Sequence, residues 1–96
     1  MAKAKKLNST SSLADVCKEL FKQANVEIVR SSTNDVLFKS GSGVVIHITR
    51  NNERSTVVQE YEDGSKRLLY VEVMDKFTPY ESVQHAQERI NDALGL

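Results

Sequence analysis

The most reactive side chains of this sequence are one cysteine and two histidines. Cys17 follows Leu13 by four residues on the apolar face of a predicted helix, where burial keeps a thiol protonated and unreactive. His47 lies in a β-rich segment, and His85 follows Glu81 by four residues, a spacing that gives ordinary pairs on a helix surface. A tetrahedral zinc site needs more ligands than these residues provide. We therefore expect no catalytic residue, no metal and no cofactor.

Two other segments carry residue types that occur in catalytic sites. Glu60, Glu62 and Asp63 gather before Gly64, but carboxylates in a turn are solvated, and acid–base catalysis needs burial that separates their pKa values. Residues 41–43 are Gly-Ser-Gly, without the Lys-Ser/Thr and the following helix that a phosphate-binding loop requires. Both segments are typical of turns. The sequence thus predicts a protein that is not an enzyme.

Cations and aromatic side chains leave nucleic-acid binding open as an alternative. Residues 1–11 contain three lysines and no acid, and we expect them to form a flexible basic arm. Lysines neutralise phosphates, and aromatic rings on a sheet stack on bases. The remaining residues hold ten basic and 13 acidic side chains, which argues against a general nucleic-acid surface. The candidate contacts are Lys3, Lys5, Lys6, Lys66 and Arg67, with Tyr61 and Tyr70 as stacking groups.

The elements that position these groups form one α+β domain over residues 12–96. A helix begins near Ser12 and ends near Asn25, and Thr78-Pro79-Tyr80-Glu81 is a capping box that starts a second helix ending at Gly95. Between them, β-branched runs alternate with turn signals. We expect an antiparallel five-stranded meander with the helices mainly on one face, and strands at residues 26–30, 36–39, 44–50, 56–62 and 66–74.

The Asp63-Gly64 turn sets the register of the last two strands. A two-residue loop pairs Glu60 with Arg67 and Val58 with Leu69, and the first of these pairs joins opposite charges. A three-residue loop with a bulge shifts the register, and the sequence leaves that alternative open. In the two-residue register the face under the helices comprises Val58, Leu69, Val71 and Val73, with Val44, Ile46 and Ile48 of the third strand.

The opposite face of the sheet is then more apolar than a solvated face should be. We expect it to be an interface, because contiguous exposed apolar surface marks interaction sites and a homodimer covers it most simply. One helix on each face, or ordinary scattered apolar residues, would also account for the pattern. The predicted interface residues are Val45, Val57, Tyr61, Leu68, Tyr70 and Met74. The protein is expected to be a small interaction or accessory protein that binds itself or a protein partner.

The compartment follows from composition. No apolar run reaches the roughly 18–20 residues that span a bilayer, and no apolar stretch of signal-peptide length follows the first lysines. A single cysteine forms no internal disulfide. We expect a cytoplasmic protein without membrane contact.

Overall fold

Both helices begin at the predicted capping residues in the computed structural model, which describes residues 11–96. Helix α1 (Leu13–Leu20) starts where the Ser12 hydroxyl accepts a hydrogen bond from the Asp15 amide, and a short 3-10 turn (Lys22–Ala24) follows it. Helix α2 (Pro79–Leu94) starts with the complete capping box of Thr78 and Glu81. The ten residues that begin the predicted basic arm lie outside the described part of the chain.

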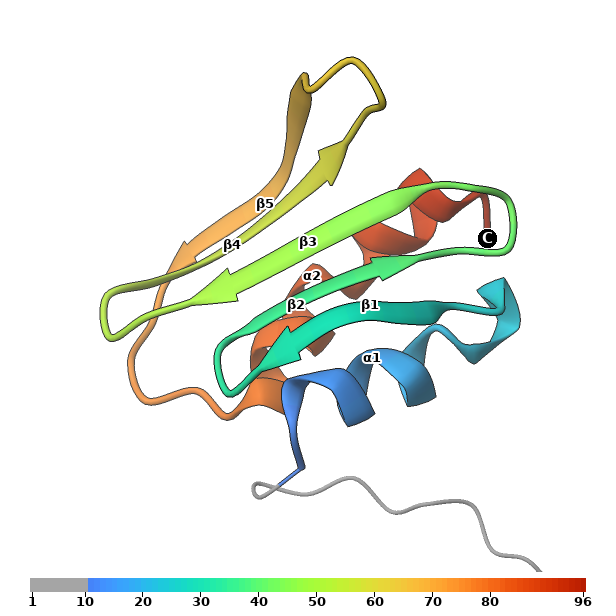
Figure 1. Cartoon of the computed structure of the whole chain (residues 1–96). Helices are drawn as coiled ribbons and strands as arrows, with labels where there is room; N and C mark the ends of the chain where they lie inside the picture. Colours follow the sequence, from blue (N-terminus) through green and yellow to red (C-terminus); the bar gives the residue numbers. More distant parts are fainter. Residues whose placement is uncertain (1–10) are drawn as a thin grey trace, which may run out of the picture.

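Five strands form one antiparallel sheet in the order of the sequence, each paired with its neighbours. Figure 1 shows α1 and α2 together on one face of this sheet. Helix α1 contacts β1 and β2, α2 contacts β4 and β5, and the two helices contact each other. The predicted fold class is therefore confirmed. The strands are β1 (Glu27–Ser32), β2 (Asp35–Lys39), β3 (Val45–Arg50), β4 (Arg54–Glu60) and β5 (Lys66–Val73).

The core lies between the sheet and the helices. Alternate residues of β2 and β3 point into it, because successive side chains of a strand face opposite sides. The rings of Phe21 and Phe38 stack with centroids 5.7 Å apart and join the end of α1 to β2. The buried apolar side chains are Leu13, Val16, Cys17, Phe21, Val36, Phe38, Ile46, Ile48, Val57, Leu69, Val83, Ala86, Ile90 and Leu94.

The two-residue loop predicted for the β4–β5 turn is wrong, and the three-residue alternative is the one observed. The Tyr61 amide donates to the Ser65 carbonyl at 2.9 Å, and Gly64 has φ 88°, a left-handed conformation that suits glycine. Glu60 therefore pairs with Lys66 rather than with Arg67. This slip of one residue moves the neighbouring side chains to the other face of the sheet.

A bulge between Val57 and Val58 corrects the slip part of the way along the hairpin. Val58 pairs with Leu68, whereas Val57 pairs with Tyr70, so the two halves of β4 have different registers against β5. Val58, Val71 and Val73, predicted under the helices, instead lie on the face away from them, and Val57 and Tyr70 lie under the helices. The predicted burial of Leu69, Ile46 and Ile48 is confirmed, and Val44 packs partly buried against the core.

Arg50 joins the end of β3 to three other segments. Its guanidinium donates hydrogen bonds to the Ser82 hydroxyl of α2, to the Asn34 side chain in the β1–β2 turn and to the Phe77 carbonyl before α2. Partial burial lowers the pKa of this guanidinium from its ordinary value. Arg50 thus fixes the entry of α2 relative to the sheet.

Replacing Arg50 should destabilise the fold more than replacing an exposed arginine. Arg50→Ala removes three hydrogen bonds from a charged donor, and we expect a loss of about 1.5–3 kcal/mol in the free energy of unfolding. Urea unfolding followed by circular dichroism measures this. Arg54→Ala, at an exposed position of the neighbouring strand, is the control and should change stability by less than about 0.5 kcal/mol. Equal effects of the two variants would contradict the role of Arg50.

The Cys17 thiol should be protected as long as the chain is folded. Burial raises its pKa to about 12, so the thiolate does not form at neutral pH. Because this value lies above the ordinary 9.0, the stability linked to this thiol is complete below pH 9.0 and is lost progressively as pH rises from there towards 12. We expect an aromatic disulfide reagent at pH 8 to label Cys17 only in denaturant. Rapid labelling of the native protein would refute this.

Candidate interaction surface on the open face of the sheet

Neither helix, nor any other element of residues 11–96, covers the second face of the sheet, here called the open face. Its apolar side chains concentrate on β5, where Leu68 is 59% exposed, Val71 47% and Val73 81%. Val58 of β4 lies beside Leu68 and is half-buried. Three large aliphatic side chains are thus exposed along one edge strand, which is an unusual concentration for a solvated face.

A polar network crosses the same face and takes one side chain from each strand. At its centre, His47 of β3 places Nε2 2.9 Å from Asp35 Oδ2 and Nδ1 3.1 Å from Glu60 Oε2. The outer members are cations: Arg30 Nε lies 3.5 Å from Asp35 Oδ1, and Lys66 Nζ lies 4.0 Å from Glu60 Oε2. The network therefore alternates cation and carboxylate on both sides of one histidine, and its formal charges balance around that histidine.

The protonation of His47 decides which partners it joins. The imidazolium has two N–H donors and can donate to Asp35 and Glu60 at once. The neutral ring protonated on Nδ1 donates to Glu60 alone, and its Nε2 can accept from Arg30 Nη2 at 3.3 Å. His47 is only 16% exposed, and no serine, cysteine or lysine nucleophile is among its partners. The arrangement therefore holds charges in place on this face.

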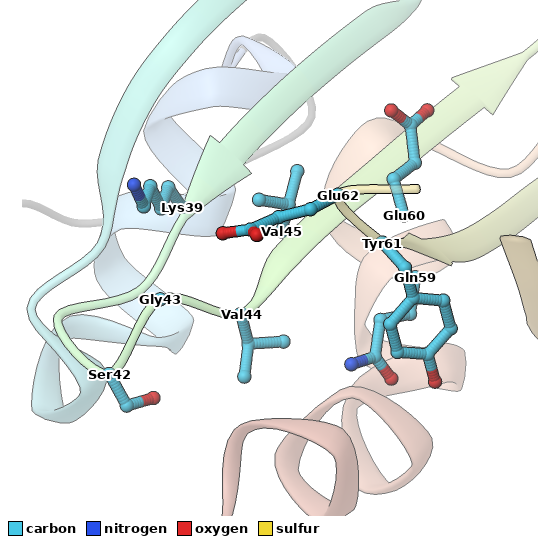
Figure 2. A pocket seen from close by; sticks show the side chains of 9 residues that line it. All are labelled: Lys39, Ser42, Gly43, Val44, Val45, Gln59, Glu60, Tyr61 and Glu62. Atoms are coloured by element: carbon cyan, nitrogen blue, oxygen red, sulfur yellow. The ribbon is translucent and has the colours of Figure 1, made fainter. Parts of the chain in front are cut away.

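A hollow of about 340 Å³ adjoins the network where β4 ends. Figure 2 shows that Val45 and Glu60 lie on one side of the strands and that Gln59 and Tyr61 point to the other side. Glu60 contacts His47 and Lys66 from the side of the hollow that it shares with Val45. The hollow therefore takes side chains from both sides of the strands and does not belong to the open face alone. It is lined by Lys39, Ser42, Gly43, Val44, Val45, Gln59, Glu60, Tyr61 and Glu62.

The six predicted interface residues do not lie on one common face in the structure. Val45 and Leu68 lie on the open face, but Val57 is completely buried under the helices. Tyr70 faces the helices as well: its hydroxyl donates to Glu72 Oε2 at 2.8 Å, and burial, together with this hydrogen bond, raises its pKa. The physical reason is the pairing of β4 with β3: Ile48 pairs with Val57 and His47 with Val58, whereas the prediction placed Val58 on the face of Ile46 and Ile48. The two-residue register of the hairpin would itself pair Val57 with Tyr70, as observed.

Two further predicted residues lie beyond the ends of their strands. Tyr61 is exposed in the β4–β5 turn and points to the side of Gln59, away from Glu60 (Figure 2). Met74 follows β5 and lines a hollow with Arg50, on the side of the α2 entry. Neither belongs to the open face.

The predicted nucleic-acid contacts do not form a common surface. Lys66 belongs to the network, whereas Arg67 is exposed at the next position of β5, where side chains point to the other face. Tyr61 and Tyr70 both lie away from the open face, so the expected stacking platform is absent from it. Lys3, Lys5 and Lys6 lie outside the described residues.

The sequence reasoning missed Arg30 and Asp35, which complete the network. Their signal was the alternation of β2, where Asp35 and Leu37 flank buried Val36 and so must share the open face. The same alternation correctly put His47 opposite Ile46 and Ile48.

Among residues 11–96, a second group of titratable side chains lies between β5 and α2, where Glu72 accepts from the Tyr70 hydroxyl and lies 3.0 Å from His85 Nδ1. No group of three histidine, cysteine or acidic side chains within this part of the chain could hold a metal ion. The helices of this part are too short or too polar to cross a membrane. Comparison with known proteins gives no match to a family model, to a curated protein or to a solved structure.

Replacing His47 should show by how much two unpaired carboxylates lower the free energy of unfolding. His47→Leu leaves Asp35 and Glu60 close together without their shared partner, and we expect a loss of about 1–3 kcal/mol in the free energy of unfolding. The triple variant Asp35→Asn/His47→Leu/Glu60→Gln removes the unpaired charges and should recover part of this loss. Chemical denaturation of both variants tests this. A triple variant less stable than His47→Leu would show that the carboxylates do not cause the loss.

Proposed function

We propose that this chain is a non-catalytic interaction protein that uses the open face of its sheet to bind a second copy of itself. The observation that carries the proposal is the row of exposed aliphatic side chains on β5 beside a half-buried, internally paired charge network. An exposed apolar strand is costly in a monomer and is a hazard for aggregation. A closed two-fold dimer covers it without creating a new exposed face.

The expected affinity follows from the size of the face. Strand spacings of about 4.8 Å make a five-stranded face about 19 Å wide, and six residues of strand make it about 20 Å long. A face of these dimensions buries about 760 Å² in total in a dimer, which is below the roughly 1,200 Å² of standard specific interfaces and is typical of weak contacts. Burial of one valine or leucine side chain contributes about 1.5–3 kcal/mol. A weak, reversible dimer is therefore expected.

Analytical ultracentrifugation over a range of concentrations tests this function. The wild-type chain should approach twice its monomer mass of 10.8 kDa as concentration rises. Leu68→Lys puts a charge among the exposed aliphatic side chains of β5 and should leave a folded monomer. Gln84→Lys makes the same change of charge on the exposed side of α2 and should dimerise like the wild type.

Two results would contradict the proposal. One is a wild-type chain that stays monomeric at millimolar concentration. The other is a folded Leu68→Lys variant that dimerises as well as the Gln84→Lys control.

A further inference from the structure

Five residues form one straight row across the open face near its β4–β5 turn. The register places Glu27 beside Lys39, Lys39 beside Val45, Val45 beside Glu60, and Glu60 beside Lys66. Each strand contributes one member. The signs of charge along the row are therefore negative, positive, neutral, negative and positive.

The charges of this row, here called the charge row, are complementary to the charges of the same row read in the opposite direction. Turned end to end, it presents positive, negative, neutral, positive and negative side chains. We infer that the open face binds a second copy of this chain with the two-fold axis along β3, so that Glu27 meets Lys66 and Lys39 meets Glu60 of the other copy. The inference rests on the proposed function and adds the register of the dimer to it.

The neighbouring row supports the same axis. It contains Arg30, Leu37, His47, Val58 and Leu68 in that order across the sheet. Reversal places Leu37 against Val58, an apolar contact beside the charge row, and it places Arg30, whose aliphatic stem can cover an apolar group, against Leu68. It also places His47 against its own copy. An axis across the strands through this row would bring together only one kind of opposite-charge pair, Lys39 with Asp35, and would put Arg30 against its own copy.

The geometry of packed sheets permits these contacts. Two sheets that pack face to face cross at about 30°. The edge strands lie about 10 Å from β3, so this angle displaces the ends of opposing rows by about 5 Å. Lysine and glutamate side chains are long enough to bridge that displacement, and Glu27 and Lys66 are at opposite edges where they remain hydrated.

The distance between Glu27 and Lys66 within one chain makes the inference testable. Glu27 and Lys66 of one chain are four strand spacings apart, about 19 Å, and cannot form an ion pair within it. Glu27→Lys creates a chain that is positive at both ends of the row, and Lys66→Glu creates one that is negative at both ends. Each variant opposes like charges in its own dimer, and the two variants oppose unlike charges when mixed.

Sedimentation at low ionic strength should show that each variant alone dimerises at least tenfold more weakly than the wild type. An equimolar mixture should associate within about threefold of the wild-type affinity, and 0.5 M salt should reduce these differences. Circular dichroism checks that both variants fold, because Lys66→Glu also removes the contact with Glu60. Lys18→Glu and Glu88→Lys, at exposed helix positions, are the matched control pair and should match the wild type alone and mixed.

The possible failures are distinguishable. If the wild type dimerises and Leu68→Lys prevents it, but the mixture associates no better than either variant alone, the register is wrong and the proposed function stands. If the wild type stays monomeric, the proposed function fails and this inference with it.

Discussion

The bulge between Val57 and Val58 is the local feature on which both faces of the sheet depend. On β4, Val57 faces the helices and Val58 the open side by ordinary alternation. On β5, Leu69 has no partner in β4, so Tyr70 faces the helices whereas Leu68, two residues away, faces the open side. Side chains alternate along a strand, so one inserted residue exchanges the faces of everything beyond it. Without the bulge, the helix side and the open side of the hairpin could not both have their observed composition.

The two faces of the sheet differ because the domain has only two helices to cover them. Seven of the 14 buried apolar side chains lie within α1 and α2. Both helices lie on one side of the sheet. No described element remains to cover the other side. The chain therefore has one complete core and one face whose aliphatic side chains on β5 stay exposed. The charge network keeps this face ordered, because each of its buried or half-buried charges has a partner.

Local signals in the sequence predicted the elements well. The capping residues Ser12 and Thr78 fixed the starts of the helices, because a side chain that accepts from the first turn acts within four residues. Asp63-Gly64 correctly indicated a hairpin. It did not determine the loop length, because the same dipeptide fits loops of two and three residues, and only packing against the helices selects between them.

The candidate surface was less predictable because it depends on the pairing of β4 with β3. Val45 and His47 were placed on the correct face because β3 is regular, whereas Val57 and Tyr70 were placed on the wrong one because the prediction matched Val58, and not Val57, with Ile46 and Ile48. Arg30 and Asp35 could not be joined to His47 from the sequence, since their contacts depend on which strands are neighbours. Non-local pairs of this kind have no signature in spacing along the chain.

The combination of an apolar edge strand with fixed charges suits recognition better than either feature alone. Apolar contact supplies affinity but little preference among registers, because Leu68 or Val71 can pack against any aliphatic neighbour. Charges at a hydrated rim contribute little affinity, yet wrong juxtapositions of like charge are costly. The network holds Glu60 and Lys66 in one arrangement before any partner arrives. Less ordering is then required on association, so a small surface can select one orientation while binding only moderately.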